Sequence, residues 1–137
     1  MKSAKSIKEA IVRNYPAIGF DETLGAAIRA MTKNNASALV VKQKGDFLGI
    51  VTITDIMHSL ADEQDLHETQ INSFMTQCDL ISGQGTRNPC AQLDEEQDAL
   101  SAIKVMHEAG VHHLVVSGSD GKPVGVVSSL EIIRLFG

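Results

Sequence analysis

Apolar residues follow two kinds of spacing along this 137-residue chain, and their order predicts its elements. Leu24, Ile28 and Met31 recur at helical spacing, which predicts a helix with one buried face. Two short, nearly continuous apolar runs, separated by a turn with glycine, are typical of buried strands. The predicted elements are a short helix at 7–12, an extended segment at 15–20, a helix capped by Asp21 that ends at Asn34-Asn35, strands at 36–42 and 47–53, and a helix at 55–60.

The same order of elements occurs a second time in the chain. Ala99, Ile103 and Met106 repeat the spacing of the first helix, and the runs 111–116 and 124–127 repeat the two strands. One such repeat has about 45–50 residues and buries only a marginal core alone. The sequence therefore predicts an α/β (α+β) fold of two β-α-β-β-α repeats packed as a pseudo-twofold pair. Ligand clefts are expected between them, at the carboxyl ends of the strands.

The most informative stretch is residues 48–56, where an apolar run meets hydroxyls and an acid at the start of a helix. Gly49 allows close backbone approach. Thr52 and Thr54 offer hydroxyls, and Asp55 offers a carboxylate beside a helix start that attracts anions. Two interpretations stay open: a site for a sugar diol and a phosphate, or a helix cap worth about 1 kcal/mol. The stretch recurs at 124–132 with Gly125, Ser128 and Glu131.

Charge and composition exclude several functions. The net charge is −5 and the pI about 5.4, which argues against nonspecific nucleic-acid binding. No apolar run approaches the roughly 20 residues of a membrane helix, and no export signal is evident. Cys78 and Cys90 lack Cys-x-x-Cys spacing, so we expect free thiols in a reduced, cytoplasmic protein. No nucleophile lies beside a base, so we expect no catalytic site. We also expect no metal site and no cofactor.

The duplicated motif resembles a known family. Two copies of glycine, two apolar residues, Ser or Thr, two further residues and an acid, each preceded by strand, helix and strand, resemble a tandem pair of CBS domains, often called a Bateman module. The resemblance covers residues 16–136. It implies a regulatory sensor that binds an adenosine-containing ligand such as AMP, ADP, ATP or S-adenosylmethionine. It also implies a homodimer and a regulated partner protein.

The resemblance assigns roles to individual residues. Asp55 would accept hydrogen bonds from the ribose hydroxyls, Thr52 would meet a phosphate and Ile50 would flank the base. Family clefts are shared between repeats, so Val111 and His112 would complete this first site, where Thr54 offers another hydroxyl. Glu131 replaces the usual Asp in the second copy, which predicts a weaker second site. That second site would use Ala36, Ser37, Val126, Ser128 and Glu131.

The remaining predictions concern the domain boundary and single residues. The predicted domains are residues 1–68, including the N-terminal helix, and residues 69–137, including an inserted loop at about 78–88. Adjacent His112 and His113 on a strand point to opposite faces and cannot chelate one metal. Arg87 is a candidate phosphate partner.

Two other functions stay open. Side chains and the 78–88 loop could fill the clefts, so that the pair serves only to dimerise. Glu131 and the long loop favour this structural interpretation. A redox-responsive module through Cys78 and Cys90 is a third hypothesis.

Overall fold

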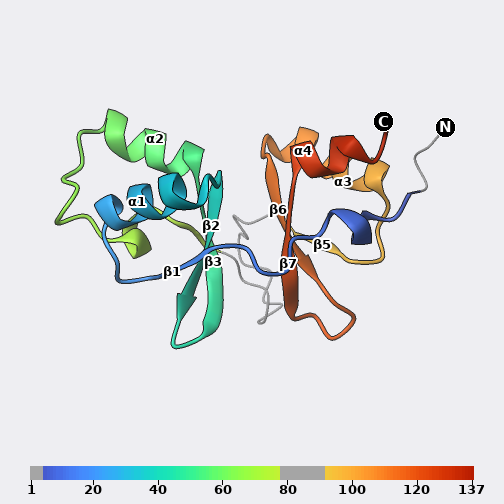
Figure 1. Cartoon of the computed structure of the whole chain (residues 1–137), viewed down its shortest axis with the longest axis horizontal. Coiled ribbons are helices and arrows are strands. Elements are labelled where there is room, and N and C mark those ends of the chain that lie inside the picture. The colour runs from blue at the N-terminus through green and yellow to red at the C-terminus, as the bar shows by residue number, and fades with distance from the viewer. Residues whose placement is uncertain (1–4, 78–91) are drawn as a thin grey trace. The chain divides into compact units, whose positions relative to one another are not determined.

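A computed structural model of the chain describes residues 5–77 and 92–137 (Figure 1). The described residues form two compact units. Residues 15–77 form the first-repeat unit, and residues 5–14 together with 92–137 form the second-repeat unit. Cys78, Cys90, Arg87 and the predicted 78–88 loop lie outside the described residues.

The first-repeat unit is a four-stranded sheet in the order β1-β2-β3-β4. β1 runs parallel to β2, and the other neighbours are antiparallel. Both helices of this unit lie on the same side of its sheet (Figure 1). Their buried side chains share one core with Leu39, Val41 and Val51. The elements are β1 (Ala17–Gly19), α1 (Leu24–Asn34), β2 (Ala38–Gln43), β3 (Asp46–Thr52), α2 (Ile53–Ala61), the 3-10 turn η3 (Ile71–Ser73) and β4 (Thr76–Gln77).

The second-repeat unit has the same order of elements, with a three-stranded sheet in the order β5-β6-β7. Its core contains Ala102, Met106, Leu114 and Ile132. The predicted β-α-β-β-α repeats are therefore confirmed in both units. The elements are β5 (Gln92–Asp94), α3 (Ala99–Ala109), β6 (His113–Ser117), β7 (Pro123–Ser128), α4 (Ser129–Arg134) and, at the N-terminus, the 3-10 turn η2 (Ile7–Ala10).

Local capping explains where α1 begins and ends. The predicted cap, Asp21, is wrong: the helix begins after Thr23, whose hydroxyl accepts a hydrogen bond from the Ala26 N–H at 3.1 Å. Asn35 ends the helix as predicted, with a left-handed φ of 50° that asparagine tolerates. The acid at position 21 instead lies in the turn after β1.

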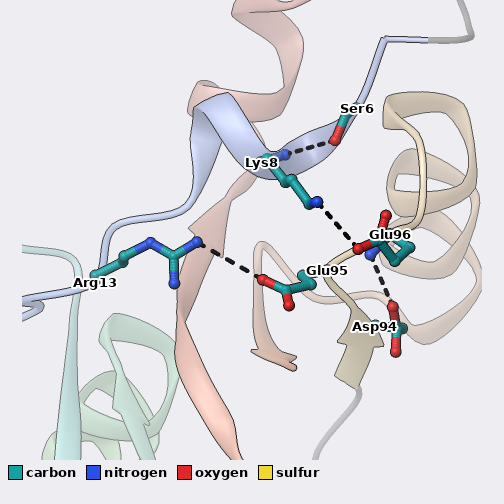
Figure 2. Close-up of polar contacts among 6 residues, drawn as sticks. All are labelled: Ser6, Lys8, Arg13, Asp94, Glu95 and Glu96. Atoms are coloured by element: carbon teal, nitrogen blue, oxygen red, sulfur yellow. Dashed lines mark hydrogen bonds and ion pairs between the residues drawn. The ribbon is translucent and has the colours of Figure 1, made fainter. Parts of the chain in front are cut away.

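The N-terminal segment packs on the second repeat, which corrects the predicted grouping of residues 1–68. Ile7 is fully buried in the core of the second-repeat unit. Val12 and Val126 exchange backbone hydrogen bonds of 2.9 and 3.1 Å. Two ion pairs also join the N-terminal segment to the second repeat (Figure 2). Lys8 lies 3.0 Å from Glu96, and Arg13 lies 3.7 Å from Glu95. The predicted helix at 7–12 is a 3-10 turn followed by this strand-like pairing.

Residues 69–76 play the same part in the first repeat. The Ile71 N–H donates to the Glu22 carbonyl at 2.8 Å, as the Ile7 N–H donates to the Gln97 carbonyl at 3.2 Å. Ile71 is also fully buried. Each repeat is thus completed by the segment that precedes the other repeat in the sequence. Local sequence patterns do not predict this exchange, because each segment precedes one repeat in the sequence and packs on the other.

No helix within residues 5–77 and 92–137 combines the length and the apolar character required to cross a lipid bilayer.

Candidate functional site

The start of α2 is built around a reciprocal cap. The Thr52 hydroxyl accepts a hydrogen bond from the Asp55 N–H at 3.3 Å, and the Thr52 N–H donates to Asp55 Oδ2 at 3.0 Å. This capping box satisfies two backbone donors that a helix start leaves unpaired. The helix therefore begins at Ile53 rather than at Asp55 as predicted. The capping interpretation of this stretch is confirmed, and it uses part of the Asp55 carboxylate.

Thr76 adds a second donor to that carboxylate. Its hydroxyl lies 3.2 Å from both Asp55 oxygens, and it comes from β4, 21 residues further along the chain. Burial raises the pKa of the Asp55 carboxyl above its ordinary value, although the hydrogen bonds from Thr52 and Thr76 act in the opposite direction. Partial desolvation therefore destabilises the charged form of Asp55 more than these hydrogen bonds stabilise it.

A cavity of about 320 Å³ opens beside Asp55 within the first-repeat unit. It combines carboxylates, an imidazole, hydroxyls and one aromatic ring. Such a polar lining can bind the hydroxyl and amine groups of a small ligand. The lining residues are Asp55, His58, Ser59, Asp62, Gln64, Thr69, Ser73 and Phe74.

The second motif has a different arrangement. The Ser128 hydroxyl accepts from the Glu131 N–H at 3.3 Å, so the cap on the amide is retained. The Glu131 carboxylate instead binds Arg134 Nη1 at 2.8 Å, one turn along the exposed helix. Val12 pairs with β7 where Thr76 pairs with β3, and valine has no hydroxyl to donate. The two motifs therefore present their acids to different partners.

The strand before each motif lies close to its own helix start. The Ile53 N–H donates to the Ser37 carbonyl at 3.1 Å, and the Ser129 N–H donates to the His112 carbonyl at 2.8 Å. His112 is exposed, with Nδ1 3.3 Å from Ser129 Oγ, whereas His113 is buried. The opposite orientation of the two histidines is confirmed.

The other predicted site residues are placed as follows. Ile50 is buried on β3, opposite Thr76 of β4, and Thr54 is exposed on the first turn of α2. Val126 is buried on β7, and Ala36 and Val111 are half-buried before β2 and β6. That Val111 and His112 complete the site of Asp55, and that Ala36 and Ser37 complete the second site, stay predictions.

Sequence reasoning missed Thr76 and His58. Thr76 contacts Asp55 only because β4 pairs with β3, and no local pattern signals a contact across 21 residues. His58 lies one turn after Asp55 on α2, so its helical spacing from that acid was a usable signal.

Among residues 5–77 and 92–137, no group of three or more His, Cys, Asp and Glu side chains is arranged to hold a metal ion.

Comparison with protein-family models matches the CBS domain twice, at residues 7–62 and 86–137. The chain belongs to the CBS domain family. The two matches cover most of the sequence, and each contains the β-α-β-β-α elements of one repeat, which confirms the resemblance drawn from the duplicated motif. CBS-domain proteins are generally regulatory and signal-transduction modules.

Several curated proteins contain a similar segment. The chain is 28% identical over 95% of its length to a segment of homoserine O-acetyltransferase from Methanococcus vannielii, of which it spans 24%. It is 25% identical over 83% of its length to a mitochondrial CBS domain-containing protein of Arabidopsis thaliana, of which it spans 52%. The chain thus spans about half or less of the length of these relatives.

Solved CBS structures share the fold. The CBS domain of a bacterial CNNM/CorC family Mg²⁺ transporter matches with a TM-score of 0.74 and 20% identity, over 96% of this chain and 75% of that one. Hypoxic Response Protein I, solved with two coordinated zinc ions, matches with a TM-score of 0.72 and 21% identity, over 95% and 98%. At these identities the likeness concerns the fold alone.

Proposed function

We propose that this CBS pair is a sensor that binds an adenosine-containing ligand, AMP, ADP, ATP or S-adenosylmethionine, through Asp55. Binding would shift a homodimer or an associated partner protein between two states. The observation that carries the proposal is a half-buried carboxylate at the edge of a polar cavity, at the motif position that the family uses for ribose.

The energetics of Asp55 favour a role beyond capping. Thr52 by itself satisfies an amide of the helix start, as Ser128 does in α4 without help from its acid. Burial disfavours the charged form of Asp55, so a purely structural cap has no need of a carboxylate there. Residues held in costly states are typical of binding sites. The oxygens of Asp55 are suited to the two donors of a ribose diol.

The homodimer is proposed on the surface of α2. Ile53, Met57 and Leu60 follow one another at helical spacing, and they are 46%, 62% and 47% exposed. Large apolar side chains that line one helix face are typical of protein contacts. A second copy of the same chain is the partner that we expect on this face. We also propose a cytoplasmic location and no catalytic activity for this chain.

A structural module remains the second candidate. The reciprocal cap at α2 and the Arg134 contact of Glu131 both engage the motif acids without a ligand. In this case the pair would dimerise and bind none of the four ligands.

Calorimetry with AMP, ADP, ATP and S-adenosylmethionine tests the sensor proposal. Asp55→Asn is the informative variant because the amide oxygen can still accept from Thr52, so the cap is preserved. We expect Asp55→Asn to weaken binding at least about tenfold, the loss of roughly one charge-assisted hydrogen bond. Asp46→Asn, on the exposed start of β3, is the control and should bind as the wild type does. Silence of the wild type with all four ligands would favour the structural module.

A further inference from the structure

The hydroxyl of Thr76 occupies the part of Asp55 that a ribose would need. The two oxygens of a carboxylate offer about four lone-pair sites. Oδ2 already accepts the Thr52 N–H, and the single hydrogen of the Thr76 hydroxyl is shared between Oδ2 and Oδ1. The Thr52 N–H and the shared Thr76 hydrogen together engage three of these sites and leave one on Oδ1, whereas a vicinal diol requires two acceptor sites.

We propose that Thr76 is a regulatory residue of the Asp55 site, whose hydroxyl competes with the ligand for the carboxylate. This inference rests on the proposed function and adds its regulation. In the ligand-free chain the Thr76 hydroxyl holds Asp55. Binding transfers Asp55 to the ligand and releases the hydroxyl of β4.

Because Thr76 lies on β4, the loss of its hydrogen bond to Asp55 can affect residues outside the binding site. Among the described residues, β4 pairs with Gly49 and Ile50 of β3, at one end of the first-repeat sheet. The loss of a side-chain hydrogen bond beside this pairing should lower the local stability of β4. β4 also continues directly into the sequence that leads to the second repeat.

The second repeat shows what the competing donor contributes. Val12 holds the strand position that corresponds to Thr76, and the acid of that motif, Glu131, turns to Arg134. The acid of the second motif, which has no hydroxyl on the neighbouring strand and is one methylene longer, binds this arginine instead of the helix start. The hydroxyl is therefore a feature of the first site alone.

The competition lowers the apparent affinity for the ligand. A ligand that binds only when Asp55 is released has its affinity reduced by the fraction of molecules in that state. Removing the hydroxyl should remove this reduction. We expect Thr76→Val, which keeps the shape of the side chain, to bind the preferred one of AMP, ADP, ATP and S-adenosylmethionine about tenfold more tightly than wild type.

Thr76→Ser and Thr32→Val provide the controls. Serine keeps the hydroxyl, so Thr76→Ser should bind as wild type does. Thr32 is exposed on α1, outside the cavity, and its hydroxyl donates to the Arg29 carbonyl at 3.1 Å, so Thr32→Val should leave affinity unchanged. Circular dichroism melting verifies that each variant is folded.

A second readout needs no ligand. NMR titration of the Asp55 side-chain carbon should give a higher pKa in Thr76→Val than in wild type and in Thr76→Ser, because a donor to the charged form is lost. An Asp55 pKa that does not respond to Thr76→Val overturns the competition whatever the ligand does.

The binding results separate the two levels of the proposal. Tighter binding by Thr76→Val supports the competition, as does binding that appears only in this variant. Equal or weaker binding overturns it and leaves the nucleotide function in place. If none of the four ligands binds wild type, Thr76→Val or Thr76→Ser, the proposed function itself is refuted and the competition falls with it.

Discussion

Gly125 lies directly against Val12. A Cβ atom placed on Gly125 would be 2.6 Å from the Val12 carbonyl oxygen and equally close to Ile11 Cγ2. The absence of a side chain at Gly125 therefore allows the N-terminal segment to pair with β7. In the first motif Gly49 pairs with Gln77 of β4, so the same position admits a neighbouring strand in both repeats.

Gly125→Ala should destabilise the second-repeat unit. The methyl group would force the Val12 backbone away and strain two hydrogen bonds, a change of about 1–3 kcal/mol in the free energy of unfolding. Urea unfolding followed by circular dichroism measures it. Gly19→Ala is the matched control, since its new Cβ would meet only the Asp21 and Glu22 side chains, at 3.3 Å or more. Equal unfolding midpoints for the two variants would contradict this packing.

Ile7→Ala and Ile71→Ala should each destabilise the repeat that the mutated segment completes. Both isoleucines are fully buried, and truncation of a buried isoleucine to alanine costs about 2–5 kcal/mol. Hydrogen exchange locates the effect: Ile7→Ala should lower protection of β6 and β7, and Ile71→Ala that of β2 and β3. Lys8→Ala, which removes only an exposed ion pair, should leave exchange unchanged. Loss of protection in β2 and β3 by Ile7→Ala would contradict the assignment of this segment to the second repeat.

The stability of the chain should fall as the pH drops below about 6.5. Burial, helped by the nearby His112, lowers the pKa of His113 from its ordinary value of 6.5. The unfolded chain therefore takes up a proton below pH 6.5 that the folded chain resists, and stability is lost toward the folded-state pKa by up to about 1.4 kcal/mol per pH unit. Melting temperatures between pH 8 and 5 measure it. His113→Ala should flatten the profile, whereas exposed His107→Ala should not; identical slopes would exclude His113 as the cause.

Asp55→Asn should raise the melting temperature at neutral pH while it weakens ligand binding. Burial raises the pKa of Asp55, so the folded state disfavours the carboxylate that exists at pH 7. The gain should be no more than about 3 °C, since solvent reaches the partly exposed side chain. It should shrink as the pH falls and Asp55 protonates in the wild type. A lower melting temperature for Asp55→Asn would show that the charge stabilises the fold.

Met57→Glu should convert the proposed dimer to a monomer. Met57 is the most exposed large apolar side chain of α2, and a charge at the centre of an apolar contact leaves a carboxylate desolvated. Light scattering after size exclusion gives the mass. Lys33→Glu, a charge change on the exposed end of α1, is the control. An unchanged dimer mass for Met57→Glu would place the contact elsewhere.

The order of elements in each repeat follows from residues close together in sequence. Met31 and Met106 are buried as their helical spacing predicts, and Asn35 ends α1. Helix starts were less accurate, because the capping hydroxyl lies two or three residues from the acid that first suggests the boundary. Thr23 and Thr52 cap α1 and α2, ahead of the leucine and isoleucine that begin each helix.

The sequence by itself determined the duplication, the strand and helix pattern and the motif residues Thr52 and Asp55, because these are encoded by periodicity and local chemistry. Only the tertiary structure decided that Ile7 completes the second repeat, that Thr76 reaches Asp55 and that Glu131 turns to Arg134. Strand pairing brings together residues far apart in the chain, and which carboxylate gains a neighbouring hydroxyl depends on that pairing. The difference between two nearly identical motifs therefore comes from the segments beside them, Val12 in one repeat and Thr76 in the other.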